Sequence, residues 1–196
     1  MNTSIAASCV APILLCQYIS VAEKRGIDTS KLRVTIQNDP LRDRIISHRP
    51  AAKHLEISLR TAGDVIEYMV KHMPLSMPIN VNEGALRTVG LPGAEDIALG
   101  ITRAMTYIDE VLKRGLNIDD FAHRIVFLFA TTPQIFEEVA RIRAARKIWA
   151  EIMKERYGAQ NPRSWKMKAS IAPATYPLVP QEPLNNITRL TLEVLS

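Results

Sequence analysis

Cysteine is scarce in this chain, and it lacks both a long hydrophobic run and a leader-like N-terminus. Only Cys9 and Cys16 among the 196 residues are cysteines. Thiols in a mostly apolar segment are typical of small core residues in a reducing compartment, not of a disulfide framework. No apolar run reaches the roughly 18 residues that span a bilayer, and no positively charged residue precedes the apolar stretch Ile5–Leu15. The sequence therefore predicts a cytoplasmic protein without a membrane segment.

Motifs for binding nucleotides or nucleic acids are also missing. No glycine-rich loop follows any strand-like run, which argues against a dinucleotide site. No basic stripe is interleaved with aromatic residues, which argues against a nucleic-acid partner. The net charge of +5 comes from basic residues that are spread through helical stretches and offset by nearby glutamates. A solvated helix face explains this pattern, and a phosphate-rich partner is the alternative.

The composition, 47% hydrophobic and 23% charged, fits one globular domain over residues 1–196. Neither a linker nor a second domain is evident. The expected strands are Leu32–Gln37, Pro78–Asn82, Arg124–Ala130, the weaker Ser164–Ser170 and a strand end at Asn2–Ile5. The continuous apolar run in Arg124–Ala130 is typical of a strand buried on both faces.

Helical periodicity is clearer than the strand signals. The expected helices are Ala11–Arg25, Asp64–Met73, Glu95–Arg114, Pro133–Tyr157 and Asn185–Leu195. Around the helix over 133–157, Thr132 is the expected N-cap, Pro133 suits the first helical position and Gly158 suits the end.

Strands and helices alternate about five times, which indicates an α/β fold with a parallel sheet and helical crossovers. We expect an incomplete TIM-type (β/α) barrel of about five βα units with outer helices. A closed barrel needs eight units and typically about 250 residues, more than this chain has.

Three segments carry a family resemblance: TIQNDPL from Thr35, FEEVARIRAARKIWAEIMKERYGAQNPRSW from Phe136 and QEPLNN from Gln181. They resemble the substrate-binding barrel of the methylmalonyl-CoA mutase family. These adenosylcobalamin-dependent isomerases rearrange the carbon skeletons of acyl-CoA thioesters by radical chemistry. The resemblance covers nearly the whole chain and implies a partial barrel, from about the third strand to the seventh helix. The first two strands, the last strand and the cobalamin-binding domain have no counterpart.

The resemblance implies four substrate-binding residues. Thr35 and Gln37 match a threonine and a glutamine that line the substrate channel, although Thr35 could equally pack in the barrel and Gln37 cap the next helix. Arg124 matches an arginine that helps to hold the CoA moiety. Lys168 replaces another arginine, keeping its charge but losing the bidentate fork that suits phosphate.

For Arg124 the alternative is a salt bridge with Asp119 or Asp120. The family arginine that binds the substrate carboxylate falls near Ser47 and His48, where Arg49 takes its place if the loop shifts by two residues.

Departures from the family concentrate at the reacting centre. An adjacent tyrosine–histidine pair, expected at the thioester carbonyl, is replaced by Gly84 and Ala85, so we expect no catalytic residue. Val126 and Leu128 replace a polar and an aromatic channel residue, and Ser170 and Ala172 replace a histidine and a glutamine that the resemblance places over the corrin ring. The cobalt-ligating motif DxHxxG is absent, and the scattered histidines predict no metal site.

Three functions remain open. The chain is a component of a cobalamin-dependent acyl-CoA mutase that is inactive alone, a non-catalytic structural or regulatory subunit, or a stand-alone acyl-CoA-binding fragment. The expected partners are an acyl-CoA and either a mutase subunit or a second copy of the chain. Adenosylcobalamin is implied by the resemblance only, bound mainly by a missing domain or partner.

Overall fold

The computed structural model describes residues 2–46, 54–174 and 178–195. Within these ranges the fold is α/β, and every strand pairing is parallel. The strands are β1 (Thr3–Ala6), β2 (Val34–Gln37), β3 (Ile79–Asn82), β4 (Ile125–Thr131) and β5 (Lys168–Pro173). The parallel α/β fold class expected from the alternation is confirmed.

The five strands lie in space in the order in which they occur in the chain. One sheet pairs β1 with β2, and the other has the order β3-β4-β5. A parallel bridge between Thr35 and Met77 connects them: Met77 N–H donates to Val34 O at 2.7 Å, and Ile36 N–H donates to Met77 O at 3.1 Å. A doubly wound sheet reverses its strand order at a switch point. The described strands show no such reversal.

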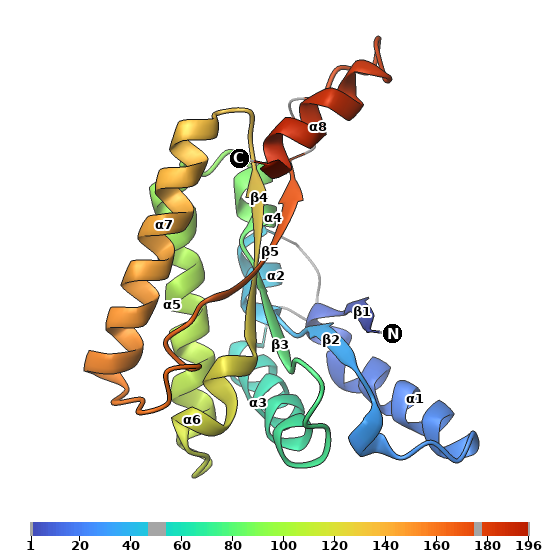
Figure 1. The fold of residues 1–196 in the computed structure, drawn as a ribbon. Coiled ribbons are helices and arrows are strands. Elements are labelled where there is room, and N and C mark those ends of the chain that lie inside the picture. The colour runs from blue at the N-terminus through green and yellow to red at the C-terminus, as the bar shows by residue number, and fades with distance from the viewer. Residues whose placement is uncertain (1, 47–53, 175–177, 196) are drawn as a thin grey trace.

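Helices form a layer along one side of the strands. They are α1 (Ala11–Lys24), α2 (Pro40–Ile46), α3 (Leu55–His72), α4 (Gly84–Thr88), α5 (Gly93–Leu112), α6 (Ile118–Phe121), α7 (Ile135–Glu151) and α8 (Asn185–Leu195). In Figure 1, α5 and α7 stand side by side against the central strands, and α1 lies by β1 and β2. α8 contacts β5 and projects outward beyond the carboxyl end of the sheet, with its last turn near the top of β4 (Figure 1).

The helical layer packs against alternate residues of β2, β3 and β4. Ile79 and Val81 of β3 and Phe127 and Phe129 of β4 pack in one core with α3, α5 and α7. Val34 and Ile36 of β2 pack in a second core with α1 and α3. Because side chains alternate between the faces of a strand, the face away from the helices carries the intervening residues: Thr35, Gln37, Asn80, Val126 and Lys168.

Several element boundaries differ from the sequence prediction. β5 begins at Lys168, four residues later than expected, and runs to Pro173. α3 begins at Leu55, not at Asp64. α7 begins at Ile135 after Gln134, so Thr132 and Pro133 precede it. Gln134 is therefore the N-cap, and Thr132 lies two residues before it; its hydroxyl accepts the N–H of Gln134 at 3.4 Å and donates to the buried carboxylate of Glu138 at 2.9 Å.

The end of the long helix agrees with the prediction. A π-helical turn over Ile152–Arg156 follows α7. Gly158 then adopts a φ of +62°, a backbone conformation that suits glycine best. The continuous burial of β4 was also predicted correctly, because all its residues except Leu128 are buried.

Candidate functional site

A buried carboxylate, Asp39, joins the carboxyl ends of β2 and β3. It follows β2, and its Oδ2 accepts hydrogen bonds from Arg103 at 2.6 Å and from the backbone N–H of Asn82 at 2.9 Å. Its Oδ1 accepts from the Tyr107 hydroxyl at 2.8 Å and from Arg42 N–H, at the start of α2, at 3.3 Å. These bonds fix the ends of both strands against α5.

Glu83 extends this network from the end of β3. Arg103 donates to its Oε1 at 3.1 Å, whereas Oε2 has no hydrogen-bond partner within the described residues. Burial raises the pKa of Glu83 to about 8, despite the opposing charge of Arg103. The carboxylate lies over Gly100 of α5, where a Cβ would overlap it. A glycine is therefore required for this approach.

A second buried network lies in the most strongly family-like segment. Arg141 of α7 donates to Glu138 at 2.8 Å, to Asp96 of α5 at 2.9 Å and to the carbonyl of Ala130 at 2.6 Å. Arg87 of α4 also donates to Glu138, at 3.2 Å. Burial raises the pKa of Asp96 to about 6. The network joins α4, α5 and α7 to β4, so its evident role is to hold these elements together.

The structure places the predicted residues Thr35 and Gln37 on the strand face away from the helices. Gln37 is only 8% exposed, and its Nε2 has no hydrogen-bond partner within the described chain. Gln37 does not cap the next helix, because Asp39 accepts the N–H of Arg42 at the start of α2. Thr35 is half-buried and accepts a hydrogen bond from Asn2 Nδ2 at 3.1 Å.

Lys168 opens β5 on the same face. In the register of the sheet, Lys168 pairs with Val126, and Val126 pairs with Asn80. Its Nζ lies 3.3 Å from the sulfur of Met77, the residue that pairs with Thr35. Partial burial lowers the pKa of Lys168, and the charge of Arg124 lowers it to a smaller extent. Thr35, Gln37 and Lys168 therefore fall in one band across the strands.

Arg124 does not face this band. It is 4% exposed, and its guanidinium donates to the carbonyls of Met69 at 3.0 Å, Met73 at 2.6 Å and Ser76 at 2.6 Å. It thus satisfies the last carbonyls of α3, and burial lowers its pKa to about 10. The expected salt bridge with Asp119 is wrong, because Asp119 instead accepts hydrogen bonds from residues 160, 161 and 164. Asp120, the other expected partner, does not pair with Arg124 either, because the guanidinium donates to the three carbonyls.

Sequence reasoning missed Asn80, the middle residue of the band. Its side chain is 7% exposed, and Oδ1 has no hydrogen-bond partner within the described residues. A buried polar atom without a partner costs about 1–3 kcal/mol, so two such amides on one face point to a ligand. The alternation of polar and apolar residues in the run from Ile79 to Asn82 was the signal that could have identified it.

Gly84 and Ala85, the positions expected to replace the catalytic pair, lie where β3 leads into α4. A Cβ built on Gly84 would lie 3.0 Å from the Cβ of Ala130, so a larger side chain there needs movement of β4. The backbone N–H of Ala85 donates to Asn82 Oδ1 at 3.1 Å. The expected substitutes near Ser47 and His48, including Arg49, lie outside the described residues.

Comparison with known proteins settles the family. The profile described as methylmalonyl-CoA mutase matches residues 1–196. The chain belongs to the methylmalonyl-CoA mutase family. It is 35% identical to the 2-hydroxyisobutanoyl-CoA mutase large subunit of Aquincola tertiaricarbonis, over 94% of this chain and 33% of the relative. It is 33% identical to the methylmalonyl-CoA mutase of Rhizobium meliloti, over 95% of this chain and 26% of that protein.

The methylmalonyl-CoA mutase of Escherichia coli is 31% identical over the whole of this chain and 27% of its own length. The chain therefore spans about a quarter to a third of these family members. No helix in the described ranges is long and apolar enough to cross a membrane.

Proposed function

We propose that this chain forms part of the acyl-CoA-binding wall of a methylmalonyl-CoA mutase-type isomerase and does not perform the rearrangement alone. The observation that carries the proposal is the pair of buried amides, Gln37 and Asn80, on one face of the strands: Nε2 of the first and Oδ1 of the second have no hydrogen-bond partner among the described residues. The sequential parallel strand order and the single helical layer support an incomplete (β/α) barrel.

The band from Gln37 to Lys168 has the chemistry of an acyl-CoA contact surface. Neighbouring strands lie about 4.8 Å apart, so β2 and β5 are separated by roughly 14 Å across the band. An acyl-CoA has a thioester, then amides, then phosphates along its length. Gln37 Nε2 would donate to the thioester carbonyl, Asn80 Oδ1 would accept an amide N–H, and Lys168 would attract phosphate.

Arg124 was expected beside Lys168 at the phosphates. Its carbonyl bonds leave only Nη1 without a described contact, so its contribution to binding is smaller than its position in the family suggests. Thr35 would pack beside the acyl chain.

The reacting centre lacks the groups that the chemistry needs. Gly84 and Ala85 cannot donate hydrogen bonds from their side chains, and loss of one such donor typically costs about 10²–10³ in rate. Adenosylcobalamin comes to this chain only through the family. Gly84, closed off by Ala130, and the small side chains of Ser170 and Ala172 do not fit the residues expected around it. We therefore assign no step through the cofactor to this chain.

Calorimetric titration with methylmalonyl-CoA tests the proposal. Gln37→Leu keeps the side-chain size but removes the donor, and we expect affinity to fall about tenfold, the value of one hydrogen bond. The matched control is Gln17→Leu on the exposed surface of α1, which should bind as the wild type does. Equal affinity for Gln37→Leu and the wild type would contradict the assignment.

The second candidate is a non-catalytic structural or regulatory subunit that binds a mutase partner. Commitment of Arg124 to the carbonyls of α3 favours it, because this removes one of the expected CoA contacts. The absence of binding heat with the wild type and with both variants would favour this candidate over the first, whereas binding that Gln37→Leu weakens and Gln17→Leu does not would favour the first.

A further inference from the structure

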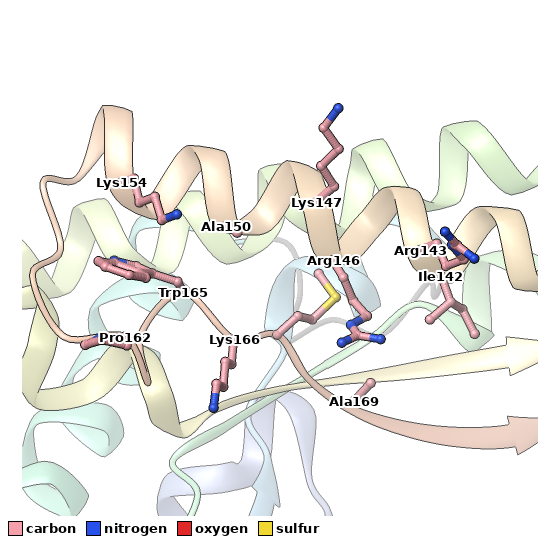
Figure 2. A pocket seen from close by; sticks show the side chains of 11 residues that line it. Ile142, Arg143, Arg146, Lys147, Ala150, Lys154, Pro162, Trp165, Lys166 and Ala169 are labelled. Atoms are coloured by element: carbon pink, nitrogen blue, oxygen red, sulfur yellow. The ribbon is translucent and has the colours of Figure 1, made fainter.

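An open groove of about 1010 Å³ lies on the outer side of the molecule, away from the acyl-CoA band. One wall is the exposed face of α7 and the π turn after it, and the other is the segment leading into β5 (Figure 2). Its floor includes the apolar side chains of Ile142, Ala150, Met167 and Ala169. We call it the α7–β5 groove.

The α7–β5 groove is lined by one sign of charge. Five of its eleven lining residues are basic and none is acidic: Arg143, Arg146, Lys147, Lys154 and Lys166. In Figure 2, Arg146 extends from α7 toward β5, and Lys154 lies over the ring of Trp165, 4.4 Å from its centroid. Lys147 has a long contact of 3.9 Å with Glu151, both well exposed. The two charges of such an exposed pair attract each other only weakly. The positive charge of the groove is therefore largely unbalanced.

The basic residues on α7 follow its axis. From Arg143 to Lys154 is eleven residues, about 16 Å of helix. An apolar floor with a basic rim of this length matches an amphipathic helix of three turns, with apolar residues on one face and carboxylates beside them. Small phosphate-containing ligands would leave the floor of Ile142, Met167 and Ala169 uncovered. A second copy of this chain is disfavoured because the net charge is +5.

We propose that the α7–β5 groove docks an acidic amphipathic helix of a partner protein. The apolar face of that helix covers the groove floor, and its carboxylates pair with Arg146 and Lys166 on the two walls. This surface lies on the helical side of the sheet, so the proposal is independent of acyl-CoA binding.

The test uses synthetic helical peptides of about 14 residues, three to four turns in length. The first has leucine and alanine on one face and glutamate on the flanks. The second has the same composition in an order that breaks the apolar face, and the third has lysine in place of glutamate. Fluorescence anisotropy of labelled peptide measures binding to the full chain, and quenching of Trp165 reports binding at the groove. Tripolyphosphate serves as a competitor.

We expect the first peptide to bind and the lysine peptide not to bind. The scrambled peptide should bind about tenfold more weakly. Arg146→Glu with Lys166→Glu should weaken the first peptide at least about tenfold, whereas Arg33→Glu, an exposed control before β2, should not. Circular dichroism verifies folding, and the milder Arg146→Gln with Lys166→Gln should weaken binding less, in the same direction.

Several results would overturn the proposal. Equal binding of the scrambled and ordered peptides would show adsorption by charge alone. Displacement by tripolyphosphate at equal potency would assign the groove to a phosphate ligand. Self-association that the glutamate pair abolishes would assign it to a second copy, and failure of all peptides to bind would leave no acidic helix site.

Discussion

Glu83 shows how one residue links the fold to solution pH. Its carboxyl is buried beside Arg103, and its folded-state pKa is about 8, against an ordinary value of 4.5. A group whose pKa is raised on folding binds more protons in the folded state. Its contribution to stability is complete below about pH 4.5 and is lost as pH rises through about 8. Asp96 acts in the same direction, over a lower range that ends near pH 6.

We predict that the Glu83→Gln variant loses part of this pH dependence. Glutamine keeps the size of the side chain but does not titrate, so the fall in the free energy of unfolding between about pH 4.5 and 8 should become shallower. Urea unfolding at a series of pH values measures the difference between the two proteins. Glu95→Gln, at an exposed position of α5, is the control and should follow the wild type. Parallel profiles for Glu83→Gln and wild type would contradict the assignment.

Only some residues of the candidate site could be predicted from the sequence. Gln37 was expected to bind substrate from the family resemblance of the segment TIQND. Its buried Nε2 has no hydrogen-bond partner among the described residues, and the binding role stays a prediction. Asn80 was missed because the run Pro78–Asn82 was interpreted only as a short strand, without assigning its residues to the two faces. The contact of Arg103 with Asp39 joins residues 64 positions apart, and no local pattern specifies such a pair.

At the scale of elements, Arg124 connects α3 to the start of β4. Three carbonyls at and just after the end of α3 accept from its guanidinium. Those of Met69 and Met73 also accept the backbone N–H groups of Met73 and Ser76. This arrangement explains why an arginine is buried there without a carboxylate.

We predict that Arg124→Leu lowers the free energy of unfolding by about 2–4 kcal/mol. The buried carbonyl of Ser76 loses its donor, and the carbonyls of Met69 and Met73 each lose one of two donors. Arg124→Lys should recover part of the loss. The exposed Arg33→Leu should change stability by no more than about 0.5 kcal/mol. Chemical denaturation of the three variants measures this, and an Arg124→Leu protein as stable as wild type would show that the carbonyls find other partners.

Elements with strong periodicity were predicted well, and short or atypical ones were not. The core strand β4 was recognisable from its apolar run, and α5 from its regular apolar face. The brief helices α2, α4 and α6 were not expected, since four to seven residues carry too little periodicity. β5 was displaced because its exposed sequence KASIAP lacks an apolar pattern.

At the scale of the molecule, the sheet has two lateral strands. Within the described ranges β1 pairs only with β2, and β5 pairs only with β4. The sequence predicted the first and last strands at Asn2–Ile5 and Ser164–Ser170; the first agrees with β1 to within a residue, and the second is corrected to Lys168–Pro173. Parallel order was predictable from the alternation of elements, whereas the exact edge depends on tertiary pairing.

The outer backbone groups of β1 and β5 should drive association of the purified 196-residue chain. Unpaired strand edges offer hydrogen bonds to another chain, and β5 is also mostly exposed on its faces. We expect sedimentation velocity to show concentration-dependent self-association, or a stable complex when a mutase barrel is added. Amide hydrogen exchange should be fast in β1 and β5 of the dilute chain and should slow on association, while β4 stays protected throughout because it is paired on both sides. A monomer at micromolar concentration with β1 and β5 as protected as β4 would mean that the two lateral strands are already covered, and that the open sheet does not exist in solution.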